Sequence, residues 1–174
     1  MASVTARTAN WRLFGGSALV IAAVLWLIAL LVSSQPWMAI IVFLLLAAAF
    51  VIIAFGQTGG NGAVGKYVPG KVALVVYAAG WALLALGSFV AIPTILAGLA
   101  IIVGGLVSAW AINSKSVAKG AARWILFVPA VIGAIWALQL IGIAVALPFF
   151  FTILLALAFA AAGVLYLLND RKLG

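Results

Sequence analysis

Residues 13–55 read LFGGSALVIAAVLWLIALLVSSQPWMAIIVFLLLAAAFVIIAF, an uninterrupted run without a charged side chain. A helix needs about 20 apolar residues to cross the hydrocarbon core of a bilayer, so this run has twice the length of one span and must reverse within it. Pro36 lacks a backbone N–H and restricts the residue before it, and the polar triplet at 33–35 precedes it. The run therefore predicts two helices, over 13–33 and 37–55.

Two further apolar runs, 72–112 and 124–168, repeat this pattern. Each is again about twice a membrane span and carries a proline near its middle, Pro93 in one and Pro148 in the other. The same reasoning gives each run two helices and one reversal. The four spans predicted here cover residues 72–90, 93–112, 124–143 and 148–168.

The composition indicates the same class of protein. The chain of 174 residues is 70% hydrophobic and 6% charged, whereas a soluble domain has about a quarter of its residues charged. We therefore expect an all-α integral membrane protein of six transmembrane helices, arranged as three sequential helical hairpins over 13–55, 72–112 and 124–168. All of 1–174 then forms a single membrane domain.

The basic residues predict the orientation. They fall before, between and after the three runs, and the turns inside the runs contain no Lys or Arg. Because cytoplasmic segments are enriched in these residues, we expect both termini and the loops 56–71 and 113–123 in the cytoplasm. The topology-determining residues are Arg7, Arg12, Lys66, Lys71, Lys115, Lys119, Arg123, Arg171 and Lys172.

Aromatic residues near the predicted span ends agree with this orientation, since amphipathic rings prefer the headgroup level. Trp37 lies near the predicted outer end. The four residues near the predicted cytoplasmic ends are Trp11, Trp110, Trp124 and Tyr166.

Three tryptophans suggest an internal repeat. Trp26, Trp81 and Trp136 are separated by 55 residues each, and each precedes the proline of its run. The coincidence of tryptophan, span, turn and charge favours a triplicated hairpin whose copies are related by an axis along the membrane normal. A duplicated hairpin is also an economical way to build a bundle, so the repeat does not by itself indicate transport.

The second run carries the clearest form of the repeat, with WALLALGSFVAIP at 81–93 followed by AGLAIIVGGLVSAW at 97–110. Hairpins of this kind, each with a tryptophan, small and aliphatic residues and a following proline, resemble the HdeD-like bacterial acid-resistance membrane proteins. The resemblance implies a six-helix inner-membrane protein connected with acid stress. It implies no catalytic motif.

The loop between the first two runs contains two strings that are typical of phosphate-binding loops. Gly60, Gly62 and Gly65 form a GxGxxG, and a GxxxxGK ends at Lys66. A phosphate cradle requires a preceding buried strand and, in the second motif, a Ser or Thr for magnesium. Here a membrane helix precedes the loop and Tyr67 takes the magnesium position, so we interpret the segment as a linker.

Gln139 is the most polar side chain inside a predicted span and lies one helical turn from Trp136. A buried amide in lipid needs partners, and we expect it to hydrogen-bond between helices rather than to contact a substrate. Together with Trp26 and Trp81, these residues are the candidate intramembrane polar or packing positions.

Small residues recur at intervals of four in the second and third runs, which allows helix backbones to approach closely. The pattern is compatible with seams inside one chain and with a homo-oligomer interface. These residues are Ala100, Gly104, Ser108, Gly133, Ala137, Ala156, Ala158, Ala160 and Ala162.

The residue types that the chain lacks argue against enzyme activity and against ion-coupled transport. The chain has no Cys, no His and a single acid, Asp170, and no predicted span contains an ionisable group. Proton relays, ion-coupled transporters and intramembrane hydrolases all need such groups. We expect no enzyme activity, no catalytic residues, no cofactor and no metal.

Two functions remain from the sequence. One is a structural or accessory protein, connected with stress, that packs against membrane lipids, a membrane-protein partner or further copies of itself. The other is a facilitator or substrate-binding component for a neutral or hydrophobic solute. A solute path should then appear as a cavity lined by Gln139, Trp136 and the equivalent tryptophans. Nucleic acid is not an expected partner, because the cations are spread over the span ends.

Overall fold

The computed structural model describes residues 11–32, 35–56, 62–115, 120–143 and 147–172, without the side chains of 169–172. The described residues form helices and the connections between them, and they include no strand. The elements are η1 (Trp11–Gly15), α2 (Gly16–Leu31), α3 (Pro36–Phe55), α4 (Val68–Leu86), α5 (Thr94–Lys115), α6 (Ala121–Trp124), α7 (Phe127–Ala137) and α8 (Phe149–Lys172).

Five helices among the described residues are long and apolar enough to cross a membrane, and a shorter apolar helix covers Ala121–Ala137. The chain is therefore a multi-pass membrane protein. The prolines mark the helix starts well, since α3 begins at Pro36, α5 begins one residue after Pro93, and α8 begins one residue after Pro148.

Three helices run past the predicted span ends and include charged residues that the prediction had placed outside the spans. The span predicted at 72–90 is α4 at Val68–Leu86, because Pro69 favours the first helical turn and the helix continues through Lys71. The span predicted at 93–112 extends to Lys115, and that predicted at 148–168 extends to Lys172. The described parts of the loops are correspondingly shorter than predicted.

The fifth predicted span, 124–143, differs most from the structure. It starts earlier, at α6, breaks at Ile125 and Leu126, and ends as regular helix at Ala137. Pro129 causes the break, because its ring has no N–H and excludes the carbonyl four residues earlier. That carbonyl, on Ile125, instead accepts the N–H of Val128 at 3.1 Å.

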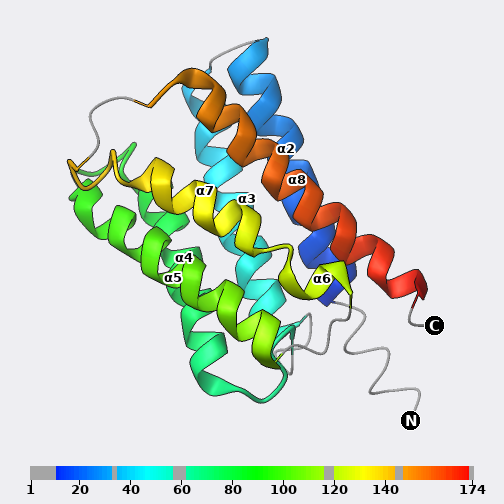
Figure 1. Ribbon diagram of the computed structural model, residues 1–174. Coiled ribbons are helices and arrows are strands. Elements are labelled where there is room, and N and C mark those ends of the chain that lie inside the picture. The colour runs from blue at the N-terminus through cyan, green and yellow to red at the C-terminus, as the bar shows by residue number, and fades with distance from the viewer. Residues whose placement is uncertain (1–10, 33–34, 57–61, 116–119, 144–146, 173–174) are drawn as a thin grey trace.

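Contacts between helices follow their order in the chain and close a ring. α2 packs against α3, α3 against α4, α4 against α5, α5 against α7, α7 against α8, and α8 against α2. Figure 1 shows the described connections after α3 and α5 at the end of the molecule where η1 starts and α8 ends. The turns after α2, α4 and α7 lie at the opposite end.

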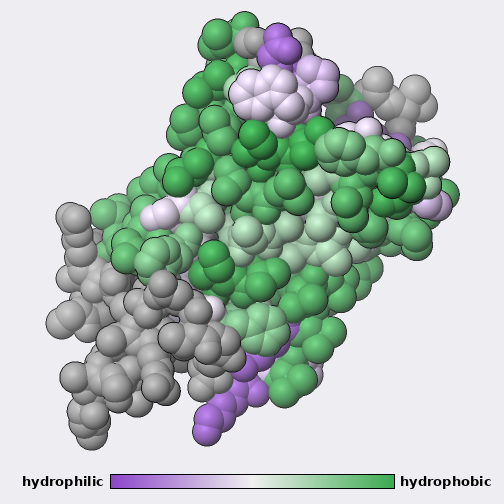
Figure 2. Space-filling view, turned by 180° about the vertical axis from the view of Figure 1, so that it is seen from behind, coloured by the Kyte–Doolittle hydropathy of each residue, from purple (hydrophilic) through white to green (hydrophobic). Residues whose placement is uncertain are grey.

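The outer surface is apolar, as a bilayer requires. Figure 2 shows hydrophobic residues across the middle of one face and hydrophilic residues at its two ends. Trp37, Trp110 and Trp124 are each about half exposed, in agreement with an interfacial position. Trp11 and Tyr166 were expected at the headgroup level too, but both are fully buried, because η1 places their rings edge to face with centroids 5.4 Å apart.

Small residues form seams inside the chain. A Cβ at Gly104 would lie 2.6 Å from the backbone N of Tyr77, so α4 and α5 meet there without a side chain between them. Gly16 of α2 and Gly163 of α8 oppose each other in the same way. Most of the predicted small residues are buried, and only Ala100 and Ala160 are partly exposed. The buried ones are Gly104, Ser108, Gly133, Ala137, Ala156, Ala158 and Ala162. These contacts assign the seams to packing within one chain.

Residues 62–67 pack against the end of α3. The N–H of Ala63 donates to the carbonyl of Ile53 at 2.8 Å, and a Cβ at Gly62 would overlap that carbonyl oxygen. Ala63 and Val64 are buried. The described part of the GxGxxG segment is thus an anchored turn, which corrects the interpretation of this part as a linker. Gly60 lies outside the described residues.

Candidate functional site

The three repeated tryptophans meet at the centre of the ring of helices. α2 contributes Trp26, α4 contributes Trp81 and α7 contributes Trp136. Their ring centroids lie 6.0 Å apart for Trp26 and Trp81, 6.1 Å for Trp26 and Trp136, and 5.8 Å for Trp81 and Trp136. Two of these contacts are edge to face and the third is stacked, the arrangements that aromatic rings prefer.

Four more aromatic rings surround the tryptophans. Trp81 contacts Phe43 of α3 at 5.8 Å, Phe159 of α8 at 5.6 Å and Tyr77 of its own helix at 6.0 Å between ring centroids. Phe50 of α3 in turn lies 4.4 Å from Tyr77. We call these four rings and the three tryptophans the aromatic core.

The aromatic core fills the centre of the ring of helices, where a solute path between the helices would run. Trp81, Tyr77, Phe50 and Phe159 are completely buried, and Trp26 is 5% exposed. Rings whose centroids are about 6 Å apart are in contact and leave no channel between them. The cavity predicted for a solute facilitator, lined by Trp136 and the equivalent tryptophans, is occupied by those side chains themselves.

Gln139 does not join the aromatic core but organises the connection after α7. Its Nε2 donates to the carbonyl of Trp136 at 3.2 Å, and its Oε1 accepts the N–H of Leu147 at 3.4 Å. Leu147 lies just before α8, so the amide links the end of one helix to the approach of the next. The predicted hydrogen-bonding role is therefore structural and uses backbone partners.

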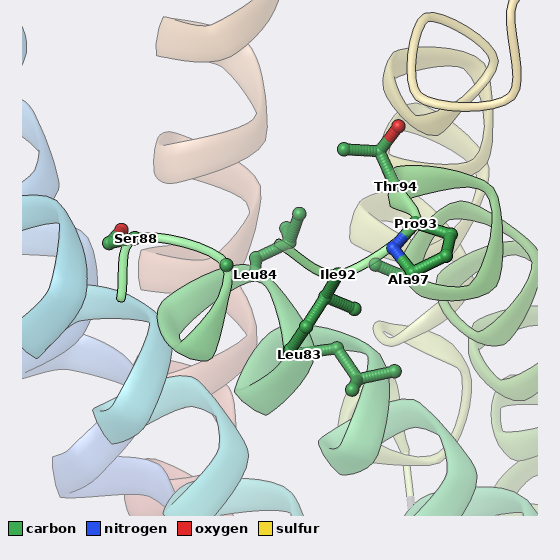
Figure 3. A pocket seen from close by; sticks show the side chains of 8 residues that line it. Leu83, Leu84, Ser88, Ile92, Pro93, Thr94 and Ala97 are labelled. Carbon is green, nitrogen blue, oxygen red and sulfur yellow. The ribbon is translucent and has the colours of Figure 1, made fainter. Parts of the chain in front are cut away.

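A pocket of about 200 Å³ lies at the turn between α4 and α5. Figure 3 shows its lining, with Leu83 and Ile92 across the middle and Ser88 and Thr94 on opposite sides. Thr94 Oγ1 donates to the carbonyl of Leu140 at 3.0 Å, so its donor is already used. The pocket is smaller than most small-molecule sites and has no ionisable lining group.

The cations of the described residues lie at one end of the bundle. Lys71 Nζ lies 5.7 Å from the ring centroid of Phe55, and Lys115 Nζ lies 5.8 Å from that of Tyr67. Arg123 Nε donates to the carbonyl of Asn113.

The structure describes the other predicted topology residues to different extents. Arg12 is buried beside Trp11, and Lys66 is exposed. Arg171 and Lys172 lie in the last turn of α8, whose side chains are not described, and Arg7 and Lys119 fall outside the described ranges.

Sequence reasoning identified the three tryptophans but not the rings around them. Phe43 and Phe50 have no aromatic counterparts 55 positions later, where the residues are Gly98 and Gly105. A Cβ at Gly105 would lie 3.1 Å from the Tyr77 ring. Gly105 of α5 thus leaves room for the Tyr77 ring of α4.

Comparison of the chain with protein-family models, with curated proteins and with solved structures gives no match.

Proposed function

We propose that this chain is a structural or accessory protein of the bacterial inner membrane, without catalytic chemistry. In this proposal the six helices form three hairpins of like orientation, and α6 and α7 together make the fifth crossing. At 1.5 Å per residue Ala121–Ala137 is about 25 Å long, close to the thickness of the hydrocarbon core. Both termini and the cation-rich end face the cytoplasm.

The aromatic core is the observation that carries the proposal. Seven rings from α2, α3, α4, α7 and α8 fill the centre of the ring of helices. A transporter needs a cavity that opens in turn to each side of the membrane, and a substrate site near the midplane. The rings fill the space between the helices and contain no group that ionises at neutral pH, so they favour a rigid body over a conduit.

The resemblance to the HdeD-like proteins adds a connection with acid stress. A chain without His and with one acid offers few groups that change charge between neutral and mildly acidic pH. Its fold would therefore persist while other membrane proteins lose theirs. We propose that it acts by remaining folded in the membrane and by contacting lipids or another membrane protein.

A flux assay tests the proposal against its alternative, a facilitator for a neutral solute. The purified protein is reconstituted into liposomes, and glycerol entry is followed by the swelling rate. We expect the rate of empty liposomes for the wild type. A rate that rises in proportion to the amount of protein would support the facilitator and reject the structural role.

Chemical cross-linking in native membranes, followed by purification, tests the accessory role itself. A stoichiometric membrane protein cross-linked to this chain, or a cross-linked homo-oligomer, would support it. A monomer that cross-links to no protein at neutral or acidic pH would contradict it.

A further inference from the structure

Two polar atoms of the aromatic core need hydrogen bonds that the packing of the bundle does not supply. The hydroxyl of Tyr77 and the indole Nε1 of Trp81 are fully buried, and neither has a hydrogen-bond partner among the described residues. Both side chains come from α4, one helical turn apart, and their ring centroids are 6.0 Å from each other. A buried donor without a partner costs free energy, and the surrounding hydrocarbon offers none. The two atoms therefore indicate a ligand that supplies hydrogen bonds inside the protein.

Gly133 of α7 leaves space beside the Tyr77 hydroxyl. A Cβ added at Gly133 would lie 3.7 Å from the hydroxyl oxygen and 3.5 Å from Leu155 Cδ1, which are ordinary contact distances. The seam glycines differ, since an added Cβ would lie 2.6 Å from the backbone N of Tyr77 at Gly104 and 3.1 Å from the Tyr77 ring at Gly105. An atom the size of a methyl group therefore fits beside Gly133 without displacing its neighbours. A water molecule has about the same size.

Trp81 reaches the same part of α7. Its ring stacks on that of Trp136 with centroids 5.8 Å apart. Trp136 follows Gly133 by three residues and shares its side of α7. Two successive turns of α4, each with an unpartnered polar atom, therefore face two successive turns of α7 in the buried interior.

We propose that a single water molecule binds between Tyr77, Trp81 and Gly133. The indole N–H of Trp81 donates to the water oxygen, and the water donates to the hydroxyl oxygen of Tyr77. The second hydrogen of the water bonds a backbone carbonyl of α7, because a helix carbonyl has two lone pairs and a glycine leaves it uncovered. Three hydrogen bonds are typical of a buried water. The water thus links α4 and α7, which are not neighbours in the ring of helices.

Tyr77→Phe tests the site, because it removes the hydroxyl and keeps the ring. We expect the midpoint of thermal unfolding in detergent to fall by about 2–4 °C, since the bound water loses a hydrogen bond. Without a bound water the sign would be opposite, because the substitution would remove a buried polar atom that has no partner. A midpoint that stays or rises in Tyr77→Phe would therefore contradict the site.

Gly133→Ala provides the second arm of the test, because its methyl group takes the place of the water. The better helix propensity of alanine offsets the lost hydrogen bonds, so this variant should keep the wild-type midpoint or exceed it. In this background the Tyr77 hydroxyl has no bound water, and Tyr77→Phe should no longer lower the midpoint. An equal fall in both backgrounds would assign the effect to packing of the ring and overturn the site.

Tyr166→Phe is the matched control. The hydroxyl of Tyr166 is also fully buried and without a hydrogen-bond partner among the described residues, but its ring contacts Trp11 of η1. The effect of Tyr166→Phe on the midpoint should therefore be the same with and without Gly133→Ala. If the effect changes sign here too, Gly133→Ala acts on the whole protein and the site is contradicted.

Solid-state NMR in proteoliposomes detects the water directly. The chain has three tyrosines, so a ¹³C label at tyrosine Cζ gives few signals, and Tyr77→Phe identifies the signal of Tyr77. Magnetisation from water protons should reach this signal in the wild type and weaken in Gly133→Ala. Absence of transfer in the wild type would contradict the site whatever the midpoints show. One enclosed water forms no path across the membrane, so the flux assay has no bearing on this result.

Discussion

Gly104 lies where α4 and α5 meet without a side chain between their backbones. A Cβ there would be 2.6 Å from the backbone N and 2.8 Å from the Cα of Tyr77. Gly104→Ala therefore forces the two helices apart, and we expect a loss of about 1–3 kcal/mol, as for overpacked cores. A lower midpoint of thermal unfolding in detergent measures this loss.

Gly133→Ala is the matched control for that substitution. Gly133 is also a buried helical glycine, but its added Cβ would meet only ordinary contacts, with Leu155 at 3.5 Å and the Tyr77 hydroxyl at 3.7 Å. Alanine is the better helix former, so the midpoint should stay or rise. Equal losses for both variants would contradict the assignment of the seam.

At the residue scale, the sequence identified which tryptophans are important but not which residues they contact. The spacing of 55 residues singled out Trp26, Trp81 and Trp136, which the structure brings into contact. Spacing of small residues did not reveal which helix they face, because a lipid-facing and a helix-facing stripe look alike in one chain. Burial of Trp11 depends on the η1 turn, for which the sequence carries no recognised signal.

At the scale of elements, Gln139 joins α7 to the approach of α8 through the backbone of Trp136 and Leu147. Gln139→Leu removes both hydrogen bonds while keeping the size of the side chain. We expect a cost of about 1–2 kcal/mol, felt locally as faster protease cleavage between α7 and α8.

Gln35→Leu is the control for this element. Gln35 is exposed at the start of α3 and makes no capping bond with its side chain. The same change of residue should therefore leave cleavage after α7 at the wild-type rate. Cleavage that responds equally to both substitutions would show that Gln139 has no specific role in the connection.

The starts of three helices could be predicted from their prolines, whereas the end of α7 could not. A proline fixes its own backbone angle wherever it occurs, so Pro36, Pro93 and Pro148 gave starts within a residue of those observed. Pro129 lies in the first turn of α7 and separates α6 from α7. The early end at Ala137 was missed, because residues 138–143 contain no charge and no proline to mark a helix end. The turn shows only in its hydrogen bonds and in the positive φ of Gly142.

The whole molecule offers a clean test of orientation, because the chain contains no cysteine that would react in the background. Ser88 and Lys66 are exposed and lie in connections at opposite ends of the bundle. With a membrane-impermeant thiol reagent, Ser88→Cys should react in intact cells and Lys66→Cys only after the membrane is opened. Reaction of Lys66→Cys in intact cells would reverse the proposed orientation.

The class of the protein and its helix order follow from composition and run length, which the bilayer constrains strongly. Closure of the helices into a ring around aromatic side chains does not, because it depends on contacts between residues far apart in the chain. α2 and α8 belong to different ends of the sequence and meet through Gly16 and Gly163. No local pattern encodes that meeting.

Accessibility of the centre tests the closed aromatic core most directly. Gly133→Cys places a thiol beside Tyr77 and Leu155, and Ser108→Cys replaces a fully buried hydroxyl with a group of similar size. In proteoliposomes, a small water-soluble thiol reagent present on both sides should label neither variant, while Ser88→Cys reacts readily. Labelling of the two buried positions at the rate of Ser88→Cys would reveal a water-filled path and contradict the closed aromatic core.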